Sequence, residues 1–154
     1  MDHVKMDKFI RQVAVYVTED YPESRHLVKA SKALKLPPDM KLWSEMNRIS
    51  LGDNKLDQLP DSPDCPVLST LFLQKNLCLE RIPDLFFKNM KKLQVLDLSH
   101  TGLISLPPSI SSLDSLKILY LVDCKNLRNL PSDIDGLKQL ETLDIWGNAF
   151  NNIL

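Results

Sequence analysis

Apolar residues recur along this chain in a phrase of the form Leu-x-x-Leu-x-Leu-x-x-(Asn, Cys or Thr), in which methionine or isoleucine sometimes replaces leucine. Within each phrase, apolar and variable positions alternate as they do in a β-strand with one buried face. The phrase returns after about two dozen residues, a period typical of proteins built from stacked identical units. Its copies begin at Met46, Leu68, Leu93, Leu116 and Leu140.

This phrase and its period are those of leucine-rich repeats, so we predict an α/β solenoid over residues 46–154. Its five repeats, the last one incomplete, place parallel strands on a concave face. After each strand a Leu-Pro or Ile-Pro pair indicates an extended or turning return path, because proline has no N–H to donate and fixes its φ angle. Ile110 with Leu113, and Ile134 with Leu137, lie three apart and predict short helices or 3-10 turns on the convex face.

The ninth position of each phrase holds a small residue that can donate a hydrogen bond. Backbone carbonyls are left open where the chain turns away from a strand, and these side chains are placed to satisfy them. We therefore interpret them as an internal ladder of the fold and not as ligand contacts. They are Asn54, Asn76, Thr101, Cys124 and Asn148.

The first 45 residues have a different pattern. Apolar residues recur at the helical period between residues 9 and 17, which predicts an amphipathic helix that ends before Pro22. Residues 23–36 are helix or extended chain, and Pro37-Pro38 marks a break. We therefore predict an N-terminal helical segment over residues 1–45. The apolar residues of its first helix are Phe9, Ile10, Val13, Ala14 and Val17.

Charge and composition exclude several classes of partner. The chain of 154 residues has a formal net charge of −1, so it offers no basic field to a phosphate backbone and we expect no nucleic-acid binding. The longest apolar stretch, residues 13–17, is too short to span a membrane, and the N-terminus lacks the apolar core of a signal peptide. We expect a cytoplasmic protein without a membrane span.

The chain lacks the residue patterns of catalytic and metal sites. Its cysteines form no C-x-x-C motif and are odd in number, which argues against a disulfide framework and a structural zinc site. The sequence contains no phosphate-binding loop, nucleophile elbow or H-E-x-x-H motif. We expect no enzyme activity, no metal and no cofactor. The cysteines and histidines considered as possible metal ligands or nucleophiles are Cys65, Cys78, Cys124, His3, His26 and His100.

Several short motifs together carry a resemblance to a known family. They are Val4-Lys5-Met6 with Ile10-Arg11, Trp43 ahead of Arg48-Ile49-Ser50-Leu51, Leu71-Phe72-Leu73-Gln74, Val95-Leu96-Asp97-Leu98-Ser99-His100-Thr101 and Leu106-Pro107-Pro108-Ser109-Ile110. With these motifs, nearly all of the chain resembles plant NB-ARC leucine-rich-repeat disease-resistance proteins of the coiled-coil type. The resemblance implies that residues 1–45 correspond to the end of the nucleotide-binding module and residues 46–154 to the first repeats.

One departure from the family limits what the resemblance implies about nucleotides. The family carries Met-His-Asp where this chain reads Met6-Asp7-Lys8. An aspartate at the second position repels a phosphate instead of donating to it. No phosphate-binding loop precedes this segment, so we assign ADP or ATP only to a full-length receptor and not to this chain. The chain also ends without a polar closing helix, which favours a fragment or a truncated product.

The resemblance implies a role in defence response through protein–protein contacts, as the recognition module of an intracellular immune receptor. The partner would be a pathogen effector, a guarded host protein or the receptor's own nucleotide-binding module. The alternative function is a general intracellular leucine-rich-repeat scaffold that is not tied to immunity.

Strand alternation predicts which side chains meet the partner. The residue between the second and third apolar positions of each phrase points away from the core onto the concave face, as does the residue two further on. Aromatic and acidic residues at these positions are the mixture that interfaces favour, although sheets also take aromatics for cross-strand packing alone. The candidate partner-binding residues are Phe72, Asp97, Tyr120, Asp144 and Trp146; the other concave positions are Ser50, Gly52, Gln74, Ser99 and Val122.

Overall fold

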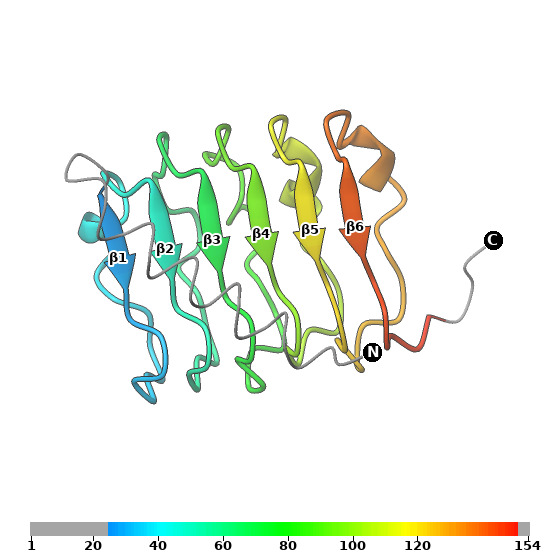
Figure 1. The fold of residues 1–154 in the computed structure, drawn as a ribbon, viewed down its shortest axis with the longest axis horizontal. Helices are drawn as coiled ribbons and strands as arrows, with labels where there is room; N and C mark the ends of the chain where they lie inside the picture. Colours follow the sequence, from blue (N-terminus) through cyan, green and yellow to red (C-terminus); the bar gives the residue numbers. More distant parts are fainter. Residues whose placement is uncertain (1–24, 151–154) are drawn as a thin grey trace.

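Six short strands form one parallel sheet in chain order in the computed structural model, which describes residues 25–150 (Figure 1). The only helices in the described return segments are short 3-10 helices. Parallel strands joined by such short return segments confirm the predicted leucine-rich-repeat solenoid. The strands are β1 (His26–Val28), β2 (Arg48–Ser50), β3 (Thr70–Phe72), β4 (Val95–Asp97), β5 (Ile118–Tyr120) and β6 (Thr142–Asp144). The 3-10 helices are η1 (Met40–Leu42), η2 (Pro108–Ser112) and η3 (Ile134–Gly136).

The middle residue of every strand lies in one seam that runs across the sheet. Each pairs in register with the middle residue of the next strand, in the order Leu27, Ile49, Leu71, Leu96, Leu119 and Leu143. The members of this seam on β2 to β5 are fully buried, whereas Leu143 is 37% exposed on the last described strand. Burial of each leucine therefore depends on a strand on both sides, as a stack of identical repeats requires.

Strand β1 lies inside the segment that the sequence predicts to be helical. The helical segment predicted over residues 1–45 is wrong at β1, where the chain takes the extended alternative that the sequence left open over residues 23–36; the described part, residues 25–45, contains β1 and the 3-10 helix η1. β1 pairs in parallel with β2, and the Lys29 N–H donates to the Ser50 carbonyl at 2.9 Å. The helix predicted between residues 9 and 17 lies outside the described residues.

The physical reason for this error is visible in the register. Lys29 and Lys32 stand where the next repeat has Leu51 and Asn54, so this first unit lacks both the third leucine and the ninth-position amide of the phrase. Asn54 of the following repeat compensates by bonding the backbone of both lysines, with its Nδ2 donating to the Lys29 carbonyl at 2.8 Å and its Oδ1 accepting from the Lys32 N–H at 2.9 Å. The first unit is thus completed by its neighbour, a property that a search for the phrase cannot detect.

The ninth-position residues form the internal ladder that the sequence predicts. Asn76 Nδ2 donates to the carbonyl of Leu73 in its own repeat at 2.8 Å and to that of Leu51 in the preceding repeat at 3.0 Å. Asn76 Oδ1 accepts from the Leu56 N–H at 3.1 Å. Corresponding bonds run from the Thr101 hydroxyl and the Cys124 thiol to the Leu98 carbonyl, at 2.7 and 3.1 Å, and from Asn148 Nδ2 to the Leu121 carbonyl at 2.8 Å.

A left-handed residue precedes each ninth position and turns the chain out of the sheet. Its N–H still belongs to the sheet ladder: Lys75 donates to the Ser99 carbonyl at 2.9 Å and His100 to the Val122 carbonyl at 2.8 Å. The positive φ then directs the side chain of the ninth-position residue toward the unpaired carbonyls at the end of the strand. Equivalent residues are Ser31 (φ 55°), Asp53 (56°), Lys75 (62°), His100 (55°), Asp123 (53°) and Gly147 (80°).

The left-handed turn predicts a stability difference between two variants of Lys75. Lys75→Val should be less stable than Lys75→Asn by about 1–2 kcal/mol, because asparagine tolerates a positive φ and a β-branched residue does not. Both variants lose the lysine side chain, so the interactions of that side chain cancel in the comparison. Urea unfolding measures it, and equal free energies of unfolding for the two variants would contradict the strain at this turn.

The ladder predicts that Asn76 contributes more to stability than Thr101. In Asn76→Ala the buried Leu73 carbonyl and Leu56 N–H lose their partners, so the free energy of unfolding should fall by about 2–4 kcal/mol. Thr101→Ala removes one donor and should cost about 1 kcal/mol. Urea denaturation of both variants against the unchanged chain tests the order, and a larger loss for Thr101→Ala would refute it.

Candidate functional site

The middle row of the concave face holds one residue from each strand. In register across the sheet it runs Val28, Ser50, Phe72, Asp97, Tyr120 and Asp144. These residues alternate with the buried seam, so they lie on the opposite face of each strand. The sheet therefore brings four of the five predicted site residues into one line. Their contact with a partner remains a prediction.

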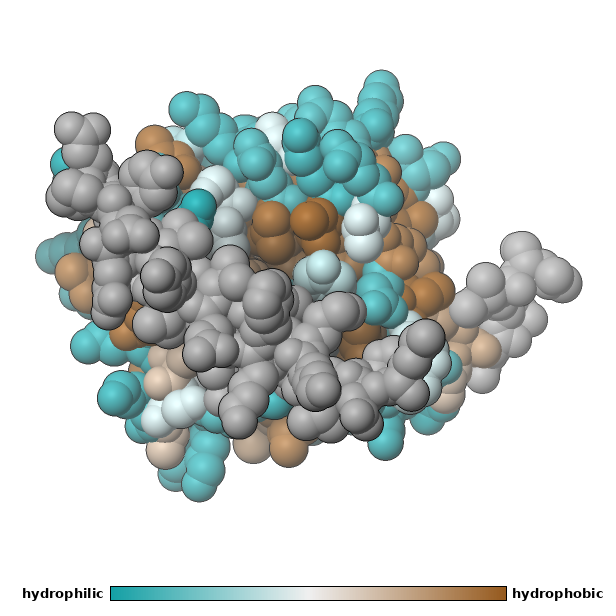
Figure 2. Space-filling view, in the orientation of Figure 1, coloured by the Kyte–Doolittle hydropathy of each residue, from teal (hydrophilic) through white to brown (hydrophobic). Residues whose placement is uncertain are grey.

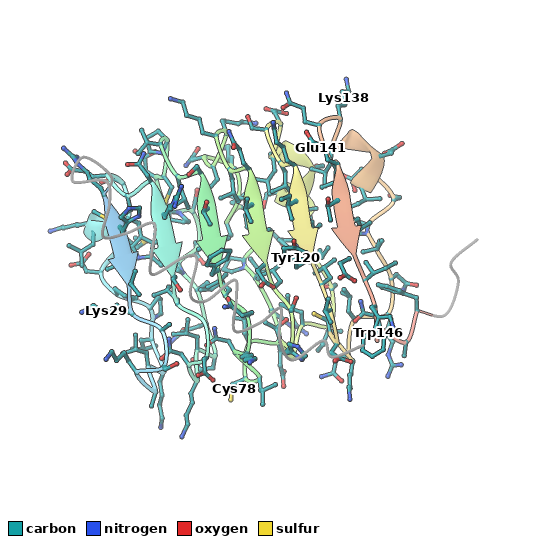
Figure 3. The ribbon with its side chains drawn as sticks, in the orientation of Figure 1. Lys29, Cys78, Tyr120, Lys138, Glu141 and Trp146 are labelled. Carbon is teal, nitrogen blue, oxygen red and sulfur yellow. The ribbon has the colours of Figure 1, made fainter. Side chains whose placement is uncertain are left out.

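The predicted site residues differ in how much of each side chain is accessible. Asp97 is buried, with 6% of its surface exposed, and Phe72, Tyr120 and Asp144 are half-buried. Trp146, which follows β6, is 61% exposed. Tyr120 projects from β5 and Trp146 from the segment after β6 (Figure 3). The aromatic residues are thus unevenly accessible, and Trp146 offers the most surface.

Two aspartates of the middle row are held in place by the backbone that follows them. Asp97 Oδ1 accepts a hydrogen bond from the Ser99 N–H at 2.9 Å. Asp144 Oδ1 accepts from the Trp146 N–H at 3.1 Å, so the carboxylate also positions the backbone of the exposed tryptophan. This contact from a side chain to the backbone two residues on is common for aspartate and restricts its rotation. The two carboxylates are therefore oriented by their own strands.

Tyr120 lies between these aspartates and experiences their charge. Its neighbours in the row are Asp97 on β4 and Asp144 on β6. Burial raises the pKa of the Tyr120 hydroxyl, and the negative charges of Asp97 and then Asp144 raise this pKa further. The phenol therefore remains protonated at neutral pH and keeps its ability to donate a hydrogen bond.

A third row on the concave face was not predicted as part of the site. Residues two before the middle row also point to this face, because alternate residues of a strand share a side. The row consists of His26, Arg48, Thr70, Val95, Ile118 and Thr142. Hydrophobic residues gather near the middle of this face, over β4 and β5, while hydrophilic residues line its upper edge (Figure 2). The second variable position of each phrase, directly before the second apolar residue, is the sequence signal that identifies this row.

The lower row lies two residues beyond the middle row, and its residues after β2, β3 and β4 are buried. Gln74 and Ser99 are 8% and 7% exposed, and Gly52 is buried. The Gln74 side chain lies directly over Gly52, where an added Cβ would approach its amide carbon to 2.7 Å. At the other end of this row Val122 is half-buried and Trp146 is exposed. The accessible part of the lower row therefore lies toward β5 and β6.

Other reactive groups of the described residues lie outside this face or are buried. Burial, reinforced by the charge of Asp64, raises the pKa of the Cys65 thiol to about 12, and burial also raises the pKa of Cys124. A hollow of about 340 Å³ lies near the left-handed turns, where His100 Nδ1 and Asp123 Oδ2 are 3.7 Å apart. Over residues 25–150, no group of three or more histidine, cysteine or acidic residues could hold a metal ion.

Within the same described range, no helix has the length and apolar character needed to cross a membrane.

Comparison with known proteins identifies the repeat and a group of relatives. A family model described as leucine rich repeat matches residues 66–125. A putative disease resistance protein of Arabidopsis thaliana is 37% identical over 145 residues, covering 92% of this chain and 16% of the relative. The Arabidopsis thaliana disease resistance proteins SUMM2 and RPS5 are 42% and 36% identical, over 78% and 93% of this chain and 14% and 16% of their own lengths.

The chain therefore spans about one sixth of the length of these curated relatives. Among solved structures, a leucine-rich-repeat protein of Leptospira interrogans matches with 18% sequence identity and a TM-score of 0.34, over 90% of this chain and 59% of that one.

The position of Tyr120 predicts a pH effect that can be measured. Asp144→Asn should lower the pKa of the Tyr120 hydroxyl toward its ordinary value, because one of the charges that oppose ionisation is removed. The phenolate absorbance titration of each chain, minus that of its Tyr120→Phe counterpart, isolates this group from the other tyrosines. The free energy of unfolding should fall as the pH rises from the Tyr120 pKa of the unfolded chain to the higher Tyr120 pKa of the folded chain, because over this range the folded state binds the proton more tightly than the unfolded state does. An unchanged titration in Asp144→Asn would contradict the proximity of the two groups.

Proposed function

Because the chain is a leucine-rich-repeat protein similar over most of its length to plant disease resistance proteins, we propose that it is a protein-recognition module that acts in plant defence. The chain covers a small part of its relatives, so this role is proposed for the repeats that it contains. The similarity favours a defence role over the alternative of a general intracellular scaffold.

The observation that carries the proposal is the unbroken row of side chains across the concave face. Six parallel strands in chain order place one residue each in this row, at the spacing of about 4.8 Å between strands. The backbone amide and carbonyl groups inside the sheet already bond to each other and to the ninth-position ladder. A partner would therefore be recognised through the side chains. Such a surface suits a protein partner, which can contact several strands at once.

Three classes of protein partner fit this proposal. They are a pathogen effector, a guarded host protein, and the nucleotide-binding module of the same receptor. We assign no nucleotide to the chain itself, because Asp7 stands at the position where the family has histidine.

A binding role, and not a catalytic one, is supported by the state of the polar groups. The thiols of Cys65 and Cys124 are buried with raised pKa values, and thiols of this kind are poor nucleophiles. The amide nitrogens of Asn54, Asn76 and Asn148 donate to backbone carbonyls. The cysteines Cys65, Cys78 and Cys124 are all free, which supports the reducing environment of the cytoplasm as the proposed location.

The proposal predicts that two aromatic residues serve binding more than stability. Tyr120→Ala and Trp146→Ala should each weaken coprecipitation of a bound protein from leaf extract, and should reduce the defence response after expression in leaves. The melting temperature should change by less than about 4 °C, because neither side chain belongs to the buried seam. Leu77→Ala is the matched control, since Leu77 is a large apolar residue that is 72% exposed outside the concave rows.

Two results would count against this assignment. Unfolding of Tyr120→Ala would show that the residue serves packing across the strands. Unchanged coprecipitation by folded Tyr120→Ala and Trp146→Ala would remove this part of the concave face from recognition.

A further inference from the structure

Charges are unevenly distributed along the concave face. Among the described residues of its three rows, the acidic side chains are Asp97 and Asp144, and the basic one is Arg48. Arg48 lies on β2 beside His26, whose pKa is lowered by burial and then by the positive charge of Arg48. The face therefore carries its positive charge on β2 and its negative charges on β4 and β6.

The negative end has an aromatic centre. Tyr120 stands between the two carboxylates in register, so each lies about one strand spacing, or roughly 5 Å, to its side. Ile118 precedes Tyr120 on the same face and Val122 follows it, and both are half-buried. A side chain laid on Tyr120 would thus meet an aromatic ring, aliphatic carbon along the strand and the half-buried carboxylate of Asp144, and it would lie in the field of the buried carboxylate of Asp97.

This combination matches one kind of ligand group. Lysine and arginine carry a cation at the end of an aliphatic stem, so the stem packs on apolar carbon while the charged head stays near polar groups. The face of an aromatic ring attracts such a cation. Arginine fits best, because its planar guanidinium can stack on the ring and share two hydrogen bonds with one carboxylate.

We propose that Tyr120, flanked by Asp97 and Asp144, is the seat for a lysine or arginine side chain of a partner protein. The proposal rests on the recognition function proposed above and adds the chemistry of the group that is recognised. The Oδ1 atoms of both aspartates already bond the backbone two residues on, so the carboxylates are oriented before the partner arrives. A preoriented site binds more tightly, because fewer side chains have to be ordered on binding.

The charge of the seat also selects against other ligands. Phosphate groups and acidic side chains are repelled by two carboxylates on neighbouring strands of the row. The positive residue of the face, Arg48, lies on β2, three strands away from Tyr120 in the order of the sheet. An acidic group would therefore be directed toward β2, and a basic group toward β5.

Two blocked peptides test the proposal on the full chain. Both have the sequence leucine–X–leucine between glycines, with X either arginine or glutamate. Each is titrated into isotope-labelled protein while the backbone amides and the indole N–H of Trp146 are followed by NMR. The arginine peptide should shift signals over β4 to β6 and bind at least about fivefold more tightly than the glutamate peptide, the ratio expected for one exposed ion pair.

Variants of the seat separate the charge from the ring. Asp97→Asn and Asp144→Asn should each weaken the arginine peptide by about fivefold. Tyr120→Phe should retain binding and Tyr120→Leu should lose about fivefold, because phenylalanine keeps the aromatic face and leucine does not. Asp133→Asn is the matched control, since Asp133 is an exposed acid outside the concave rows, and it should bind like the unchanged chain. Each variant's amide spectrum shows whether it is folded.

The double variant Asp97→Lys with Asp144→Lys gives the reverse test, in which a folded protein should prefer the glutamate peptide. Equal binding of both peptides to the unchanged chain, or unchanged affinity in folded Asp97→Asn and Asp144→Asn, would overturn the seat. The outcome is distinguishable from failure of the proposed function. Loss of coprecipitation in Tyr120→Ala without any preference for arginine would overturn the seat alone. A confirmed preference for arginine with unchanged coprecipitation would leave the seat standing and would remove this part of the concave face from the proposed recognition function.

Discussion

The stability of every repeat depends on the repeat beside it. A strand of three residues cannot bury its own leucine, and the seam residue is fully buried only where strands flank it on both sides, as Leu71 and Leu119 show against the partly exposed Leu143. Hydrogen bonding follows the same rule, because the amide of Asn76 reaches into the preceding repeat as well as its own. Nearest-neighbour contacts therefore hold the sheet together, and they also explain how an incomplete phrase around Lys29 and Lys32 becomes a strand.

The turn at the end of each strand connects this packing to the recognition face. Five of the six equivalent turn residues are not glycine yet adopt a positive φ, which places the ninth-position side chain under the strand. The backbone cost of such a conformation is offset by hydrogen bonds that the ladder makes in every repeat. Because the turns are equivalent, successive strands enter the sheet in the same register, and their outward residues fall into rows. The regularity of the interior is thus the reason that Asp97, Tyr120 and Asp144 stand side by side.

From β2 onward the apolar positions of the interior recur in every repeat, whereas the concave face varies from strand to strand. The same position of successive repeats carries serine, an aromatic ring or a carboxylate without any change in the strand beneath it. Side chains can therefore change at these positions at little cost to folding, which is compatible with the proposed recognition function. In this chain the variation produces a positive end near Arg48 and an aromatic, negative end around Tyr120.

The spacing of leucines by itself determined the solenoid, the parallel strands, the ninth-position ladder and the row of outward residues, because each follows from a period of two along a strand and of about two dozen between strands. The tertiary structure decided three further matters. It made β1 a strand of the sheet, since the bonds that complete this unit come from Asn54 of the next repeat. It showed that Val95 and Ile118 share the face with the predicted residues. It also distinguished buried Asp97 from exposed Trp146, because accessibility depends on neighbours that are distant in sequence and that no local pattern encodes.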